Sequence, residues 1–145
     1  MKTILKTKIS FILLIFIAQL SFAQVFNFNY DNGITKEKAI ENAKYYEQDL
    51  LKYDYQFARS NVKSSDNYDI IFNKKSKTGD GVLTTKISYF FSDKSVKVEI
   101  VNSFYNSQGS SYEIKPNATN QVYKNLYDAN KNLYVDVFMQ YVNLK

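Results

Sequence analysis

The side chains with which this sequence could do chemistry are carboxylates, hydroxyls and amines, because its 145 residues include neither His nor Cys. Their absence excludes a His-based triad, a thiol nucleophile and an ordinary zinc site. With only four glycines, the sequence also lacks a dinucleotide-binding fingerprint and a phosphate-binding loop. A pair of acids, or a serine beside a lysine, is the chemistry that remains. The sequence predicts no cofactor and no metal site.

Three short matches point to a serine–lysine enzyme, but their spacing argues against it. Ser60-Asn61-Val62-Lys63, Ser65-Asp66-Asn67 and Lys77-Thr78-Gly79 fit the S-x-x-K, S-D-N and K-T-G motifs of serine β-lactamases and penicillin-binding proteins, in that order. In those enzymes the three segments come from distant parts of a much larger structure. Here they fall within twenty residues of a predicted hairpin and loop, so we interpret them as chance matches.

Acidic residues offer two further candidates. Glu99, in a predicted strand, and Glu113, near a predicted edge strand, could form a hydrolytic carboxylate pair, which only geometry can identify. Cross-strand pairing with lysines is the more ordinary interpretation. Residues 128–132 begin like a calcium loop, but Leu133 stands where glycine is required and Met139 where glutamate is required. We therefore expect exposed polar residues of a helix at 128–132.

The first 23 residues have the organisation of a secretory signal peptide. A basic start precedes an apolar run from Ile9 to Ile17, and small residues at Ser21 and Ala23 suit cleavage after Ala23. The apolar run is too short for a membrane anchor. The sequence therefore predicts a secreted or periplasmic protein, with no membrane insertion after cleavage and a single domain at residues 24–145.

Loss of the signal peptide also changes the charge. The full chain carries +5, but three lysines leave with residues 1–23, so 16 basic and 14 acidic residues remain and the net charge is +2. Such a small charge gives no argument for a nucleic acid or an anionic membrane as partner. A domain of this length buries about two-thirds of its unfolded surface, so it needs no disulfide.

A hairpin between Val82 and Phe104 forms the centre of the predicted fold. With a turn at residues 92–95, the numbers of opposing residues sum to 187, which pairs Phe91 with Val96, Tyr89 with Val98, Ile87 with Ile100 and Leu83 with Phe104. Because side chains alternate along a strand, these residues share one apolar face. The other face is mixed and is expected to stay open, which makes it a candidate binding surface; its key residues are Lys86, Phe90, Glu99 and Val101.

The flanking segments supply the remaining elements. Strands are predicted at 24–30, 57–62 and 68–73, with Tyr68, Ile70 and Phe72 facing the core. A helix capped by Thr35 is predicted over 36–53, and a second helix from near Thr119 to about Asn143. Polar loops are expected at 74–81 and 105–111, followed by an optional edge strand at 112–115. Asn117-Ala118-Thr119 matches a glycosylation acceptor, but we favour a helix cap at Asn117 or Thr119.

This order of elements predicts an α+β fold, in which a curled antiparallel sheet (β-α-β-β-β-β-(β)-α) carries two helices packed on one face. The arrangement resembles the TATA-binding-protein-like one and, more loosely, helix-grip domains. Small exported bacterial domains of unknown function combine this order with a signal peptide, and the chain looks like one of them. The resemblance covers residues 24–145 and implies a fold, but it transfers no site and no activity.

For function, the sequence favours an exported, non-enzymatic binding module. Its partner would be a small ligand, in a cavity lined by Tyr and Phe between the sheet and the C-terminal helix, or an envelope protein on the open face or an edge strand. The alternative is a small hydrolase with a carboxylate-based site. A cleft holding two or more acids with raised pKa values would favour the hydrolase.

Overall fold

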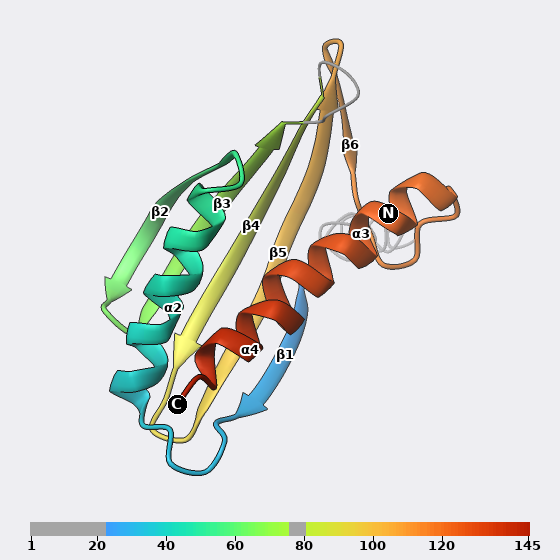
Figure 1. Cartoon of the computed structure of the whole chain (residues 1–145). Helices are drawn as coiled ribbons and strands as arrows, with labels where there is room; N and C mark the ends of the chain where they lie inside the picture. The colour runs from blue at the N-terminus through green and yellow to red at the C-terminus, as the bar shows by residue number, and fades with distance from the viewer. Residues whose placement is uncertain (1–22, 76–80) are drawn as a thin grey trace, which may run out of the picture.

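A single antiparallel sheet with helices on one face makes up the domain (Figure 1). The computed structural model describes residues 23–75 and 81–145, so the predicted signal peptide and the Lys77-Thr78-Gly79 motif lie outside the described residues. The strands are β1 (Gln24–Asn29), β2 (Tyr55–Ser64), β3 (Asn67–Lys75), β4 (Val82–Phe91), β5 (Ser95–Ser107) and β6 (Ser110–Glu113). The predicted α+β class and element order are confirmed, and the optional edge strand is present as β6.

Two helices cover the sheet. The first is α2 (Lys36–Leu51), capped as predicted by Thr35, whose hydroxyl accepts a hydrogen bond from the Lys38 amide. The second, here called the C-terminal helix, consists of α3 (Gln121–Lys131), the π-helical η1 (Asn132–Val137) and α4 (Phe138–Val142). Its cap is Asn120, whose side chain accepts from the Val122 amide at 2.9 Å, so the prediction of Asn117 or Thr119 is wrong. No helix in the described ranges is long and apolar enough to cross a membrane.

The sheet has the strand order β1-β5-β4-β3-β2, and β6 also pairs with β5. Strand β1 pairs with residues 95–100 of β5, whereas β6 pairs with residues 104–107. The two short strands therefore lie end to end along one edge of β5, and β2 forms the opposite edge of the sheet.

The central hairpin follows the predicted register only in the half next to its turn. From Ile87 to Phe91 the pairs are those expected, including Ile87 with Ile100. Beyond Ile87 the register shifts by one, because Val101 is an extra residue in β5 that has no partner in β4, a β-bulge. Leu83 consequently pairs with Tyr105, and the prediction that it faces Phe104 is wrong. Both 104 and 105 are aromatic, so hydrophobic alternation gives no warning of the bulge.

The core lies between the sheet and the two helices. The small residues Ala39 and Ala43, both fully buried, let α2 lie close to the strands. Aromatic rings fill the space between the C-terminal helix, the sheet and α2. The ring centroid of Phe138 in α4 lies 4.3 Å from that of Tyr89 and 5.3 Å from that of Tyr46. The predicted core-facing set of β3 is confirmed as buried: Tyr68, Ile70 and Phe72.

The end of β5 contains a second difference from the prediction. Residues 105–111 are not a loop, since β5 continues to Ser107 and turns tightly through Gln108 and Gly109 into β6. Both turn residues have positive φ, 48° and 77°, as two-residue hairpin turns require. This part of the hairpin is largely exposed on both faces, so its sequence carries no apolar alternation from which a strand could be predicted.

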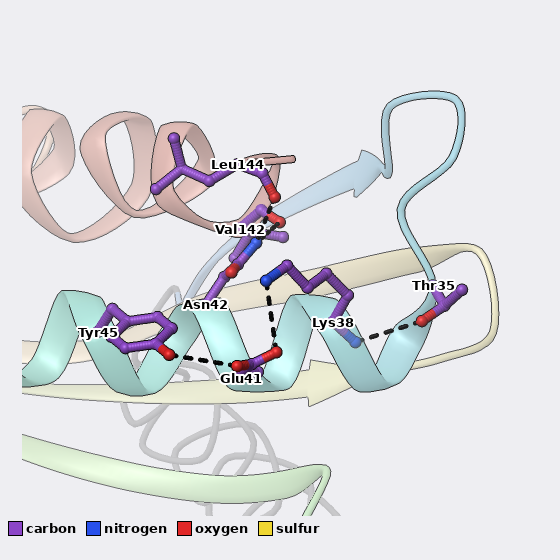
Figure 2. A network of polar contacts seen from close by, with 7 residues as sticks. All are labelled: Thr35, Lys38, Glu41, Asn42, Tyr45, Val142 and Leu144. Carbon is purple, nitrogen blue, oxygen red and sulfur yellow. Dashed lines mark hydrogen bonds and ion pairs between the residues drawn. The ribbon is translucent and has the colours of Figure 1, made fainter.

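Asn42 of α2 anchors the end of the C-terminal helix (Figure 2). Its Nδ2 donates to the carbonyl oxygens of Val142 at 3.1 Å and Leu144 at 2.7 Å, and the residue is 2% exposed. Carbonyls in the last turn of a helix have no partner within the helix, so this amide satisfies that of Val142, together with the Leu144 carbonyl just beyond the helix end. The link fixes α4 against α2 at one end of the domain.

Replacing Asn42 by Ala should lower the free energy of unfolding by about 2 kcal/mol, because at least one buried carbonyl then lacks a donor. Urea denaturation followed by circular dichroism measures this change. Lys44→Ala is the matched control, since Lys44 is an exposed residue of the same helix and its loss should cost less than about 0.5 kcal/mol. Equal stability of the two variants would contradict the anchoring role.

Candidate functional site

The residues predicted for the open sheet face are partly brought together. Lys86 Nζ lies 3.1 Å from Asp69 Oδ2, and Glu99 Oε2 lies 3.8 Å from Lys97 Nζ. The Lys97 ammonium also sits 3.9 Å from the centroid of the Phe90 ring. Val101, the remaining predicted residue, is the unpaired residue of the bulge. The structure therefore joins Phe90 and Glu99 through Lys97 and places Lys86 in a separate ion pair.

Asp69 is the residue of this open face whose carboxylate has three polar partners. It accepts hydrogen bonds from Ser88 Oγ at 2.6 Å and Asn61 Nδ2 at 3.2 Å, in addition to its ion pair with Lys86. Partial burial by itself raises the pKa of Asp69, but these three hydrogen bonds together hold the pKa below its ordinary value. The charges of Lys86 and Lys97 are thus balanced by neighbouring acids, and the Lys63 ammonium, 5.9 Å from the centroid of the Phe90 ring, is the charge on this face without a carboxylate within 4.0 Å among the described residues. Most of the open face is therefore poorly suited to recognising a partner by charge.

A hollowed surface lies instead on the side of the sheet that carries the helices. Helix α2 and the C-terminal helix meet at α4 and diverge toward α3 (Figure 1). A hollow of about 450 Å³ lies between the helices, and a second of about 530 Å³ lies between the strands and α3–η1. Both are lined by Tyr55, Lys74 and Leu133. We call the two hollows together the groove.

The floor of the groove is one row of side chains across four strands. Tyr55 of β2 pairs with Lys74 of β3, Lys74 with Leu83 of β4, and Leu83 with Tyr105 of β5. The bulge at Val101 brings Tyr105 into this row. The Tyr105 ring lies over Gly81, where a Cβ would overlap the phenol, so any larger residue at this position would displace the ring. Lys74, predicted to lie in a loop, is thus a strand residue.

The wall of the groove comes from the C-terminal helix, with Leu126 from α3 and Leu133 from η1. Two backbone carbonyls of the π-helical turn accept hydrogen bonds from buried tyrosines. The Leu133 carbonyl accepts from the Tyr46 hydroxyl at 3.0 Å, and the Tyr134 carbonyl accepts from the Tyr89 hydroxyl at 3.3 Å. Turns of this kind occur frequently at functional sites. A cavity between sheet and C-terminal helix was expected, but it is lined by Tyr and Leu rather than by Tyr and Phe.

A buried polar cluster lies beneath α3. Asn130 Nδ2 donates to Thr85 Oγ1 at 3.0 Å and Ser103 Oγ at 2.8 Å, and the two hydroxyls are 2.9 Å apart. Asn130 is 4% exposed, so the expectation that residues 128–132 are all exposed is wrong. Because no member of the cluster is a base, it positions α3 on β4 and β5 and does not activate Ser103.

The closed end of the groove is fixed by Asp49. Its carboxylate accepts from Lys52 Nζ at 2.6 Å and from the Tyr141 hydroxyl at 2.8 Å. These two hydrogen bonds, that from Lys52 foremost, hold the pKa of Asp49 below its ordinary value. The hydrogen bond to the carboxylate, together with burial, raises the pKa of the Tyr141 phenol. Asp49 is thus held as an anion that joins α2 to α4.

The acids of the described residues do not form a general acid–base pair. Glu99 lies beside Lys97 on the open face, and Glu113 Oε2 lies 2.7 Å from Lys115 Nζ at the edge of the sheet. A general acid needs a raised pKa, whereas the described carboxyls with a resolved shift, Asp49, Asp66 and Asp69, are all lowered. No group of three or more metal-binding side chains occurs within residues 23–75 and 81–145.

The single arginine of the sequence also has a structural role. Arg59 Nη2 lies 2.8 Å and 3.0 Å from the two carboxylate oxygens of Glu47, and the Tyr68 hydroxyl donates to Glu47 Oε1 at 3.2 Å. The guanidinium also stacks 4.1 Å from the centroid of the Tyr68 ring. This cluster ties α2 to β2 and β3, and it lies outside the groove lining.

Comparison with known proteins bears on the fold. No protein-family model matches the sequence, and no curated protein matches it significantly. A TBP-like protein from Parabacteroides distasonis superimposes with a TM-score of 0.54 at 14% identity, over 85% of this chain and 94% of that chain. A DUF4468 family protein from Bacteroides ovatus superimposes with a TM-score of 0.59 at 10% identity, over 85% of this chain and 86% of that chain.

At such low identity the likeness is one of fold alone, and it transfers neither a site nor an activity. It nevertheless covers most of this chain and most of both solved chains. The resemblance predicted from the element order is confirmed: the chain has a TBP-like α+β fold.

Proposed function

We propose that this protein is an exported, non-enzymatic binding module that holds a small ligand in the groove. The observation that carries this proposal is the half-exposed apolar surface at the diverging end of the helices, made by Leu83, Tyr105, Leu126 and Leu133. Well-packed domains bury such rows of side chains, and persistent apolar hollows in them are the usual form of ligand sites. The volumes of the two hollows lie within the range of roughly 300–1,000 Å³ typical of small-molecule sites.

The rim of the groove supports the same proposal. Tyr53, which follows the end of α2 and lines the hollow between the helices, is 71% exposed, so a large aromatic side chain lies at the entrance. An envelope protein on the open sheet face has less support, because most of the charges there are already paired. The hydrolase alternative also has less support, because the described carboxyls with a resolved shift all have lowered pKa values. Export rests on the predicted signal peptide, with secreted and periplasmic locations both compatible.

Replacing Leu126 by Arg should abolish ligand binding while leaving the fold intact, because a long charged side chain then fills the groove. The matched control is Val122→Arg, one helical turn earlier on α3, where the side chain is 63% exposed and lies outside the groove lining. A fragment library screened by ligand-observed NMR supplies the ligands. We expect fragments that bind the wild type and Val122→Arg and whose affinity for Leu126→Arg is at least about tenfold lower, more than 1.4 kcal/mol.

Circular dichroism of both variants checks that they are folded before binding is compared. If no fragment binds the wild type, or if Leu126→Arg binds the fragments as well as Val122→Arg does, the groove is not the ligand site. Native mass spectrometry of the protein purified from its own producer is a second measurement. Extra mass that disappears on denaturation, and that is absent from Leu126→Arg, would identify the natural ligand.

A further inference from the structure

We infer, building on the proposed function, that the ligand of the groove is a small amphipathic monocarboxylate. Its carboxylate would bind the Lys74 ammonium, and its apolar body would lie on Leu83, Leu126 and Leu133. The starting observation is an imbalance of charge. The hollow between the strands and α3–η1 is lined by two lysines, Lys74 and Lys75, and by no carboxylate among the described residues. The carboxylates of the groove, Asp49 and Asp54, line the other hollow, between the helices.

Lys74 differs from the other lysines that the structure describes. Nine basic side chains in residues 23–75 and 81–145 have a carboxylate oxygen within 4.0 Å, and Lys74 is not one of them. The other described lysines outside those nine pairs are exposed, whereas Lys74 is half-buried. A partly desolvated ammonium without an anion is costly, so this position favours a ligand that brings a negative charge.

The position of the ammonium is well defined. Lys74 Nζ donates to the Tyr55 hydroxyl at 2.7 Å and lies 4.7 Å from the centroid of the Tyr55 ring. Tyr55 is only 7% exposed and is the direct cross-strand neighbour of Lys74, so it can hold the lysine side chain along the floor. An ammonium has three N–H donors, and the phenol takes one of them. Two donors remain for the oxygens of a carboxylate.

The groove also limits the kind of anion. One half-buried ammonium balances one negative charge, whereas a doubly charged phosphate is better matched by several cationic or backbone N–H donors. The neighbouring surface is apolar: Leu126 and Leu133 face the floor residue Leu83 across the hollow of about 530 Å³. A ligand with a single charged head and an apolar body matches both features, and this description fits a fatty acid or an aryl-alkanoic acid.

Three probes with the same alkyl chain length separate the contribution of charge to the binding affinity from that of apolar contact. They are octanoate, octan-1-ol and octylammonium. Their binding to the full mature protein is followed by chemical-shift changes of backbone amides at neutral pH. We expect octanoate to bind about tenfold to a hundredfold more tightly than octanol, as a charge-assisted hydrogen bond implies. Octylammonium should bind more weakly than octanol, and the shifted amides should include those of Leu83, Leu126 and Leu133.

Variants of Lys74 test the role of the ammonium. Lys74→Gln should lower the affinity for octanoate to that for octanol, and Lys74→Glu should reverse the preference in favour of octylammonium. Lys94→Gln is the control, because Lys94 is exposed in the β4–β5 turn, outside the groove lining, and should leave all three affinities unchanged. Each variant is first checked for an unchanged amide spectrum away from the groove.

The possible failures can be told apart. If octanol and octylammonium bind the groove as tightly as octanoate, and Lys74→Gln has no effect, the inference is overturned while the groove remains a ligand site. If none of the probes shifts the groove amides at millimolar concentration, the inference is also overturned. In that case the fragment screen with Leu126→Arg and Val122→Arg decides independently whether the proposed function stands.

Discussion

Replacing Ile87 by Asp should abolish folding, whereas Lys86→Asp should leave the protein folded. Ile87 is fully buried and lies between Ile70 on β3 and Ile100 on β5, in the middle of the core. An unpaired carboxylate there costs several kcal/mol, which is comparable with a total stability of about 5–15 kcal/mol. Lys86 is half-exposed on the opposite face, so Lys86→Asp should cost only about 1 kcal/mol, because it replaces the ion pair with Asp69 by a repulsion between two carboxylates.

Circular dichroism and size-exclusion chromatography of the purified variants distinguish these outcomes. Ile87→Val is the conservative control, since it removes one methylene from the same position and should cost about 1 kcal/mol without loss of the fold. Similar behaviour of the two Asp variants would mean that the assignment of the faces of β4 is wrong.

Alkaline pH should unfold the protein in one cooperative step. Tyr46, Tyr68, Tyr89 and Tyr134 are each about 1% exposed, and burial is the main cause that raises the pKa of each phenol well above its ordinary value of 10.0. The folded state therefore keeps protons that the unfolded state loses above pH 10. Stability is fully present below that pH and is lost as the pH rises.

The expected slope follows from the number of these groups. Each phenol that ionises only in the unfolded state removes about 1.4 kcal/mol of stability per pH unit, so four remove about 5 kcal/mol per unit. A stability of about 5–15 kcal/mol is then exhausted roughly one to three units above pH 10. Tyr30 and Tyr127 add to the slope between pH 10 and about pH 12, since burial raises the pKa of each to about 12.

A pH titration that follows circular dichroism and tyrosinate absorbance together measures this transition. The part of the tyrosinate absorbance that comes from the four buried phenols should appear in the same step as the loss of circular dichroism, because these phenols ionise only when the chain unfolds. Tyr89→Phe should reduce the slope of stability against pH by about 1.4 kcal/mol per pH unit, since one of the buried phenols is removed. Ionisation of all tyrosines before any loss of secondary structure would contradict the burial of these side chains.

The periodicity of apolar residues was enough to predict those helices and strands that have one buried face and one solvent-exposed face. The helix after Thr35, the set Tyr68, Ile70 and Phe72, and the pairs from Ile87 to Phe91 all follow from it. The bulge could not be predicted in this way, because both possible registers place an aromatic residue opposite Leu83. The turn at Gln108 was hidden for a different reason, since strands exposed on both faces carry no alternation.

The groove was predicted only as a general location. Tyr55 and Lys74 stand nineteen residues apart, one between a predicted helix and a predicted strand and the other in a predicted loop. Only the pairing of β2 with β3 makes them neighbours. Leu126 and Leu133 belong to an ordinary apolar stripe, and the sequence does not indicate that the two helices diverge. The available signal was the lysine at the end of β3, which follows the Tyr68–Ile70–Phe72 alternation onto the same face.

The bulge also determines where this chain can change its length. Every pair of β4 with β5 is formed without Val101, since Ile100 pairs with Ile87 and Asn102 with Lys86. Loss of the codon for Val101 would leave each of these pairs in register and each side chain on its present face. Loss of a codon elsewhere in a paired strand exchanges the two faces from that point onward. In evolutionary terms, insertions and deletions are ordinarily confined to loops, but here one can be accommodated inside the central hairpin.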